Sequence, residues 1–293
     1  MRRGMTQTLV RHRTDDVRNS PTPAQHALAT YLNRQVDAIL AGDLALRHGQ
    51  DPIHDTRVAI RRLRSTVRVF HPVLDGGAVE RAEADLKWFA ALLGDVRDCQ
   101  VQSGRFDSAL GELPNELILG PVKSDIRNHL ASVERPARAR VTEAMDSARY
   151  LSMMAEVRRW RSAPPTAPGY TVDDLARRAK KAARKADRRL ALAADGHDDT
   201  ALHSARKAAK RARYAAELLH PLKSSAKRTV KQYKKIQSVL GDHQDTVVAS
   251  DILRRLGASM GAPADRNGFT YGLLYAREEA IARDCREAAR RLA

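Results

Sequence analysis

Two parts of this 293-residue chain repeat one another in sequence. The segment 54–64, HDTRVAIRRLR, aligns with the segment 203–213, HSARKAAKRAR, at an offset of 149 positions. Further along, the pattern Leu-Gly-Asp-x-x-Asp occupies 93–98 and returns at 240–245, at an offset of 147. Two landmarks in the same order at almost the same offset indicate an internal duplication. The chain is therefore expected to fold as two related halves.

The composition and the periodicity of both halves are those of helices. Aromatic residues make up only 4% of the chain, while Ala, Leu, Arg and Asp are abundant, which favours helix over sheet. No stretch alternates with a period of two residues, as a half-buried strand would. Helical periodicity, with breaks marked by Gly, Pro or Asn, predicts helices over 24–47, 52–73, 78–110, 121–135, 137–161, 172–194, 199–220, 223–257 and 262–292. We expect an all-α protein.

The chain divides into a tail and a domain that contains a linker. Residues 1–22 are polar and charged and run into Ser-Pro-Thr-Pro, so we expect a flexible tail followed by one domain over 23–293. Three prolines and a glycine within 162–171 cannot continue a helix. This segment is predicted to link repeat one, about 24–161, to repeat two, about 172–292.

The charge of the chain points to a polyanionic partner. Its formal net charge of +17 exceeds what solubility requires, and such a field attracts nucleic acid, anionic membranes or another polyanion. Cys99 and Cys285 are too few for a disulfide framework or a zinc site, which fits a reducing compartment. No stretch of about 18 apolar residues occurs, and the N-terminus lacks the apolar segment of a secretion signal. We expect a cytoplasmic protein that does not bind membranes.

The duplicated segments place basic residues on one helical face. In the first copy, spacings of 3, 4, 3 and 4 residues keep five side chains within about 80° of the helix circumference. This first basic row consists of His54, Arg57, Arg61, Arg64 and Arg68. The second basic row consists of His203, Arg206, Lys210 and Arg213, and Glu217 replaces a fifth cation. Further cations at helical spacing are Arg177, Lys181, Arg184 and Arg188, then Lys227, Lys231 and Lys234, and Lys87 as the first-repeat counterpart of Lys234.

Such rows predict an anion-binding surface. Like charges three or four residues apart destabilise a helix by roughly 0.2–0.5 kcal/mol per pair. Solvated helix faces usually mix both signs, whereas these rows contain hardly any acid. Arginine, which binds phosphate with two parallel hydrogen bonds, dominates the first row. Residues 171–235 hold 19 Lys and Arg against 7 Asp and Glu, so the second half is expected to bind the anion more strongly.

Two features of these segments allow more than one interpretation. His54 and His203 open the basic rows, and a lone histidine is more often a core or capping residue than a ligand. Their place on a cationic face also suits hydrogen bonds to phosphate, which would favour the charged imidazolium. The aspartates of the repeated Leu-Gly-Asp-x-x-Asp pattern could cap a helix, pair with arginines of the rows or coordinate a cation.

The segments described above resemble those of the CHAD family, the conserved-histidine α-helical domain. The matching segments follow one another in the family's order and are HDTRVAIRRLR at 54–64, LGDVRD at 93–98, SARY at 147–150 with Trp160, HSARKAAKRARYAAE at 203–217 and QSVLGDHQD at 237–245. The resemblance implies two four-helix bundles related by pseudo-twofold symmetry around a basic channel. It also implies that inorganic polyphosphate binds in this channel and that the protein associates with polyphosphate granules.

Many members of this family carry an additional N-terminal domain that processes triphosphates and has a Glu-x-Glu-x-Lys signature. This chain has neither the signature nor the length for such a domain. The resemblance therefore implies a stand-alone binding module without triphosphatase activity.

The expected function is the binding of inorganic polyphosphate by the basic rows, without catalysis, metal or cofactor. The first alternative is a nucleic-acid-binding protein, which the charge supports. Single-strand binding, however, uses aromatic residues for stacking, and Tyr214 is the only one next to a row. The second alternative, a metal-dependent phosphohydrolase, is suggested by His54 and Asp55, but Ser204 stands at the equivalent of the aspartate. The sequence does not indicate an oligomeric state.

Overall fold

The structure, a computed structural model, describes residues 21–194, 196, 198–258 and 268–293, and this part of the chain consists of helices joined by turns and loops. Its elements are α2 Pro23–Arg47, α3 Ile53–Phe70, the 3-10 helix η1 His71–Val73, α4 Gly76–Gly111, the 3-10 helix η2 Asn115–Leu117, α5 Val122–Asp146, α6 Ala148–Ser162, α7 Val172–Ala194, α8 Asp199–Leu219, α9 Ala226–Ala258 and α10 Phe269–Leu292. These residues form no strand, only an isolated bridge between Leu74 and Thr166. The predicted all-α fold is confirmed. Within the same residues, no helix is both long enough and apolar enough to span a bilayer.

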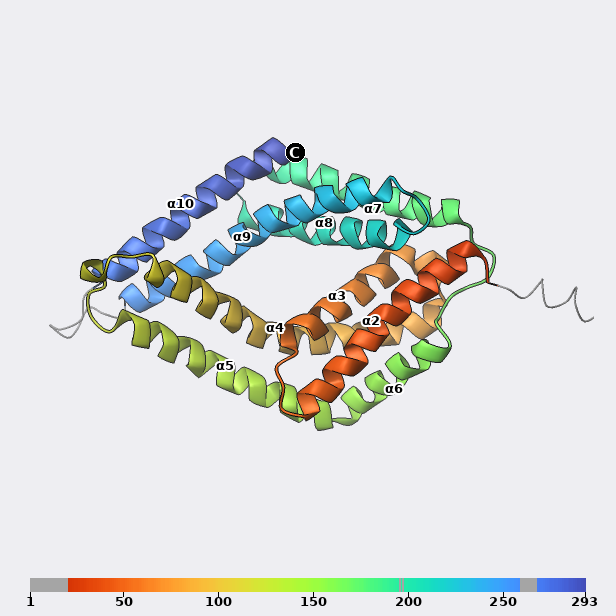
Figure 1. Cartoon of the computed structure of the whole chain (residues 1–293), viewed down its shortest axis with the longest axis horizontal. Helices are drawn as coiled ribbons and strands as arrows, with labels where there is room; N and C mark the ends of the chain where they lie inside the picture. The colour runs from red at the N-terminus through yellow and green to blue at the C-terminus, as the bar shows by residue number, and fades with distance from the viewer. Residues whose placement is uncertain (1–20, 195, 197, 259–267) are drawn as a thin grey trace, which may run out of the picture.

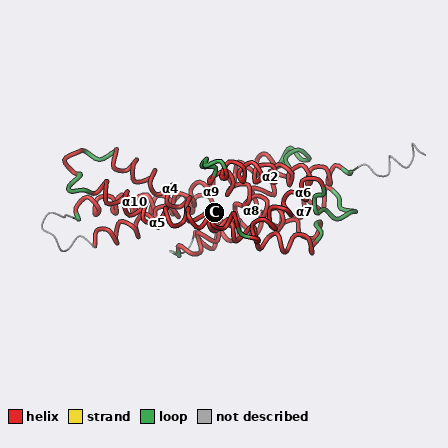
Figure 2. Tube along the Cα trace, turned by 90° about the horizontal axis from the view of Figure 1, so that it is seen from below, coloured by secondary structure: helices red, strands yellow, loops and turns green. Residues whose placement is uncertain are grey.

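The helices form a flat, elongated body. In Figure 1 α2, α3, α6, α7 and α8 lie towards one end, while α5, α10 and the last turns of α4 and α9 lie towards the other. After a quarter turn, Figure 2 shows how thin the body is in the third direction. Because α4 and α9 are the longest helices, they connect the two ends.

The first helix of each half begins with the same reciprocal cap. Before α2, the Thr22 hydroxyl accepts the Gln25 amide at 3.2 Å, and the Gln25 side chain accepts the Thr22 amide at 2.8 Å. Before α7, Thr171 and Asp174 make the same exchange at 3.2 and 3.0 Å. Such capping boxes satisfy amides that a helix start leaves free. Both halves therefore begin at points that the local sequence defines.

The buried side chains form three clusters, and two of them draw on both halves. The first cluster is built mainly from α2, α3, α4 and α6, around Phe70 and Trp160, but also takes in Leu175 of α7 and Leu218 of α8. The second cluster lies among α7, α8, α9 and the end of α10. The third joins the end of α4 and the start of α5 to the end of α9 and the start of α10. The two halves therefore share hydrophobic cores.

The connection between the halves is held in place by backbone hydrogen bonds. α6 ends at Ser162 and α7 begins at Val172. Between them, the Ala167 amide donates to the Val73 carbonyl, and the Asp75 amide donates to the Pro165 carbonyl, both at 3.1 Å. These bonds tie the connection to the turn that follows α3, and so fix where α7 starts relative to α3.

The predicted break at Pro136 was wrong. α5 continues through this proline to Asp146. Proline removes one amide hydrogen bond, to the carbonyl of Ser132, and both residues are exposed, so water can hydrate that carbonyl. The break comes at Ser147, whose backbone is extended and whose hydroxyl accepts the Tyr150 amide at 3.2 Å to cap α6. Most of the predicted tail, residues 1–20, and the predicted start of the last helix at 262 lie outside the described residues.

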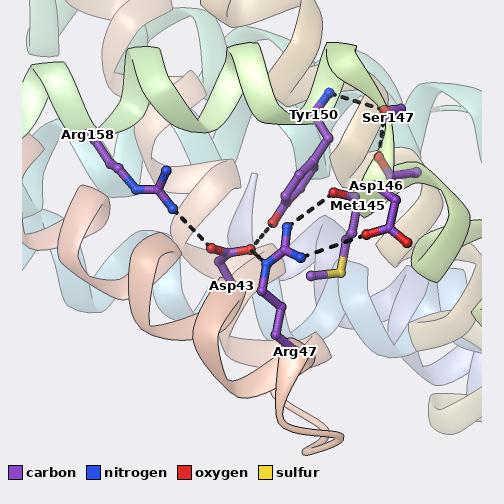
Figure 3. A network of polar contacts seen from close by, with 8 residues as sticks. Asp43, Arg47, Met145, Asp146, Ser147, Tyr150 and Arg158 are labelled. Carbon is purple, nitrogen blue, oxygen red and sulfur yellow. Dashed lines mark hydrogen bonds and ion pairs between the residues drawn. The ribbon is translucent and has the colours of Figure 1, made fainter.

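A buried carboxylate joins α2 to the cap of α6. Asp43 accepts the Tyr150 hydroxyl at 2.8 Å and the Arg47 Nε at 3.1 Å, while Arg158 reaches its other oxygen at 3.4 Å (Figure 3). Arg47 also donates to the Met145 carbonyl at 3.1 Å, at the end of α5. The pKa of Tyr150 is raised, first by burial and then by its hydrogen bond to Asp43 and the charge of that carboxylate. The SARY segment at 147–150 thus serves to fix helix positions in this chain.

Candidate anion-binding site

The two basic rows meet where α3 packs against α8. Arg57 and Arg61 of α3 lie close enough to Arg206 and Lys210 of α8 for their charges to oppose one another. None of the four forms an ion pair with any described residue, and the Nε atoms of Arg57 and Arg206 are buried without a hydrogen-bond partner. Arg61 Nε donates to the Tyr214 hydroxyl at 3.1 Å. We call these four side chains the central cluster.

Two glycines make room for two of these arginines. A Cβ atom on Gly94 of α4 would lie 3.3 Å from both Nε and Nη2 of Arg57. A Cβ atom on Gly241 of α9 would lie 3.2 Å from Nη2 of Arg206. The repeated Leu-Gly-Asp-x-x-Asp pattern therefore does the same work in both halves, because its glycine lets a guanidinium approach the helix backbone.

The last aspartate of each pattern faces the same arginines. Asp98 and Asp245 each stand one turn after the glycine. Burial lowers the pKa of Arg57, and the charge of Asp98 opposes this shift. Burial likewise lowers the pKa of Arg206 against the charge of Asp245. The first aspartates of the two patterns differ, because Asp95 pairs with Arg140 at 3.1 Å, whereas the charge of Asp242 also acts on Arg206.

Lys210 is the most strongly perturbed member of the central cluster. Burial lowers the pKa of its amine to about 6, and the charges of Arg206, Arg61 and Arg57 act in the same direction. Only Asp245 opposes them. A lysine with this pKa is largely uncharged at pH 7, since burying another positive charge beside three guanidiniums is unfavourable without an anion.

The remaining arginines of the rows have acidic partners. Glu83 of α4 pairs with Arg64 at 3.5 Å and also with Arg68. Glu217 pairs with Arg213 at 2.8 Å and with Arg62 at 3.3 Å. The inference that the cations of the rows lack acidic partners therefore fails at these positions. Glu83 comes from a different helix, which residue spacing along one helix cannot predict.

Both row histidines lie beside the central cluster. Burial lowers the pKa of His54, with Arg97 as the next cause, and Arg61 and Arg57 contribute. Burial also lowers the pKa of His203, whose Nδ1 is buried without a hydrogen-bond partner. The lowered pKa of both imidazoles favours their neutral form. Among the described residues, no three His, Cys, Asp or Glu side chains gather closely enough to hold a metal ion.

The predicted lysines of α9 extend the second row. Lys227, Lys231 and Lys234 are exposed. Lys234 stands two helical turns before Gly241 and so lies on the face that meets Arg206. Arg213 Nη1 donates to Gln237 at 3.3 Å, which brings the α8 row against α9 near these lysines. Lys87 is exposed and has the same two-turn relation to Gly94 on α4.

The predicted cations of α7 lie elsewhere. At 100° per residue they stand opposite the buried face of this helix, so they point away from α8 and from the central cluster. The outward side chains are Arg177, Lys181, Arg184 and Arg188, and the buried ones are Leu175, Ala179, Ala186 and Leu190. Arg177 also pairs with Asp174 at 3.2 Å.

The predicted set lacks two arginines that occupy equivalent positions in the two copies, Arg62 and Arg211. Arg62 packs on the Tyr214 ring at 5.5 Å and pairs with Glu217. Burial lowers the pKa of Arg211, and the charges of Arg189 and Arg68 add to the effect. The presence of an arginine at this position in both copies could have predicted them. They were missed because each lies one residue beyond the helical face that the row spacing defines.

Comparison with known proteins places these observations in a family. A family model described as the CHAD domain matches residues 30–254. Two curated Mycobacterium tuberculosis proteins, uncharacterized protein MT2285 and uncharacterized protein Rv2226, are each 32% identical to the chain over 284 residues. These matches cover 92% of this chain and 53% of each relative, so the chain spans about half the length of the curated relatives it matches.

Two solved structures have similar folds. PptA from Streptomyces chartreusis superposes with a TM-score of 0.76 at 22% identity, covering 93% of this chain and 99% of that chain. The crystal structure of the CHAD domain from the plant Ricinus communis superposes with a TM-score of 0.69 at 25% identity, covering 94% of this chain and 96% of that one.

Proposed function

The chain belongs to the CHAD domain family, and from this membership and the central cluster we propose that it binds inorganic polyphosphate without altering it. The observation that carries the proposal is the meeting of Arg57, Arg61, Arg206 and Lys210 without an ion pair among the described residues. The three guanidiniums are half-buried like charges beside an amine that is largely uncharged, and such an arrangement is unfavourable unless an opposite charge joins it. A phosphate chain supplies such charges at regular spacing.

A linear polyanion suits the surroundings of the central cluster. Guanidiniums bind phosphate oxygens with paired hydrogen bonds, and lysines act as point charges. From the central cluster, the exposed lysines of α9, ending at Lys227, continue the positive surface in one direction. Lys87 on α4 offers the equivalent contact in the other half. In the cell, such binding would bring the protein to polyphosphate granules in the cytoplasm.

The environment of Tyr214 favours polyphosphate over nucleic acid. Its side chain is 3% exposed, its hydroxyl accepts Arg61, and its ring lies under Arg62 and Arg213 at 5.5 and 5.8 Å. A base therefore has no access to this ring for stacking, and base stacking contributes much of single-strand affinity. Phosphate contacts do not need this ring, and a polyphosphate chain provides them without the bulk of bases.

The test compares two double variants that remove the same charge. Arg57→Gln with Arg206→Gln empties the centre of the cluster, whereas Lys123→Gln with Arg127→Gln removes two exposed cations of α5. Calorimetric titration with polyphosphate of defined length should show at least a hundredfold loss for the first pair, about 2.8 kcal/mol, and less than threefold for the second.

Two outcomes would contradict the proposal. Equal losses in two folded double variants would reduce binding to bulk charge. Tighter binding of single-stranded DNA or RNA than of polyphosphate, at matched phosphate concentration and salt, would favour the nucleic-acid alternative.

A further inference from the structure

Lys210 occupies the point where the charged faces of three helices converge. On α8 it stands one turn after Arg206 and one turn before Tyr214, whose hydroxyl accepts Arg61 Nε of α3 at 3.1 Å. The charges of Arg57 on α3 and Asp245 on α9 also act on it, and Asp98 of α4 acts on the neighbouring Arg57 and Arg206. α7 covers another side of α8, where a hollow of about 300 Å³ is lined mainly by alanines, with Lys180 of α7 and Lys223 before α9 as its charged residues. This half-buried amine thus lies in a cluster of guanidiniums and forms no ion pair with the described residues.

We propose that polyphosphate binds to this site together with a proton, which the Nζ atom of Lys210 accepts from solvent as the anion arrives. The inference rests on the proposed function and concerns how the same site works. The amine becomes an ammonium, and no other bond changes. The ammonium then donates to a phosphate oxygen.

Lysine is the member of the central cluster that can respond in this way. A guanidinium stays protonated in proteins, so Arg57, Arg61 and Arg206 keep their charges whether or not an anion is present. The amine can lose its charge, and in the empty site its pKa of about 6 means that it does so near neutral pH. Phosphates beside it would return this pKa towards the ordinary lysine value of about 10.4.

The duplication supports a distinct role for this position. The residue equivalent to Lys210 in the first copy is Arg61, which donates to the Tyr214 hydroxyl. One half thus presents a permanent charge and the other an amine that titrates. The site is therefore not electrostatically equivalent in its two halves, although its glycines and its remaining arginines correspond.

The sign of the expected pH dependence follows directly. Between the low pKa of the empty site and the higher pKa of the complex, binding takes up a proton. Affinity should fall as pH rises through this range, by up to about tenfold per pH unit for a single proton. The pKa values of His54 and His203 are also lowered. Their contribution to the pH dependence of affinity falls at lower pH, because the ordinary pKa of histidine is about 6.5.

The experiment counts protons. Wild-type protein is titrated with long-chain polyphosphate at pH 8 in two buffers that differ in ionisation enthalpy. Lys210→Arg and Lys210→Met are measured in parallel. The wild type should take up about one proton more than either variant, since both variants keep the two histidines. From pH 7 to pH 8 its affinity should fall about fivefold to tenfold, while that of Lys210→Arg should stay within about twofold.

Each outcome has a defined meaning. Equal proton uptake by the wild type and Lys210→Arg would overturn the inference and leave the proposed function intact. Tight wild-type binding without proton uptake would do the same. Absence of polyphosphate binding at any pH would instead overturn the proposed function. If Lys210→Met does not fold, Lys210→Arg still decides the question, because arginine occupies the equivalent position in the first copy.

Discussion

Arg206 of α8 reaches the backbone of α9 at Gly241, where even a methyl group would stand 3.2 Å from its Nη2 atom. Arg57 has the same relation to Gly94 of α4. A helical glycine costs roughly 0.5–1 kcal/mol relative to alanine. Both halves accept this cost in mid-helix, which indicates that the close approach of the arginine matters more than local helix stability.

Gly241→Ala should therefore weaken polyphosphate binding while leaving the fold intact. The added methyl group displaces the Arg206 guanidinium by a few tenths of an ångström or more, and we expect a loss of affinity of about fivefold to twentyfold in calorimetric titration. Gly104→Ala is the matched control, because it also lies within a long helix but has no neighbour within 4 Å. Similar affinities of the two variants would mean that the guanidinium position is unimportant.

Lys210 should make the stability of the unliganded protein rise with pH. Its folded pKa of about 6 lies below the ordinary lysine value of about 10.4, so between these values the unfolded chain binds the extra proton. The free energy of unfolding should then increase with pH, by at most about 1.4 kcal/mol per unit from this group. Urea unfolding of the wild type and Lys210→Met at pH 6.5, 7.5 and 8.5 measures the difference. If the free energy of unfolding changes with pH in the same way for both proteins, the pKa of Lys210 is not lowered in the folded state.

Loss of Asp43 should destabilise the fold without touching the site. Asp43→Ala leaves Arg47, Arg158 and the Tyr150 hydroxyl without their shared acceptor, and we expect a loss of about 2–3 kcal/mol in urea unfolding. Tyr150→Phe removes one hydrogen bond and should cost about 0.5–1.5 kcal/mol. The folded fraction of both variants should bind polyphosphate as the wild type does, and reduced affinity would place this network within the site.

The outward cations of α7 should contribute through bulk charge alone. Neutralising Lys181, Arg184 and Arg188 together with glutamine is expected to lower affinity less than about fivefold at 0.15 M salt, and less still at higher salt, because exposed charges are screened beyond about 8 Å. Titrations of this triple variant and the wild type at three salt concentrations test the point. A hundredfold loss that survives high salt would place α7 in direct contact with the anion.

The parts of the site that were predictable from the sequence are those that lie on single helices. The spacing of His54, Arg57 and Arg61 defines a face by itself, and so does that of Arg206 and Lys210. The duplication then indicated that both faces serve one purpose. These inferences need only the 3.6-residue period of a helix and a comparison of the chain with itself.

What remained hidden depends on contacts between helices. Glu83 of α4 pairs with Arg64 and Arg68, and the spacing of residues along α3 cannot predict these ion pairs. The role of Gly94 emerges only once α4 packs on α3. The continuation of α5 through Pro136 likewise depends on which side of the helix faces water, and local sequence does not define that side.

The sharing of hydrophobic clusters between the halves has a consequence for a broken chain. The third cluster packs Phe106 and Ile126 from the first half with Leu253 and Tyr271 from the second. A protease cut within 163–171 would sever the covalent link but leave this packing in place. Two nicked fragments should therefore remain a complex under native conditions, and either fragment alone would expose an apolar surface that only its counterpart can cover.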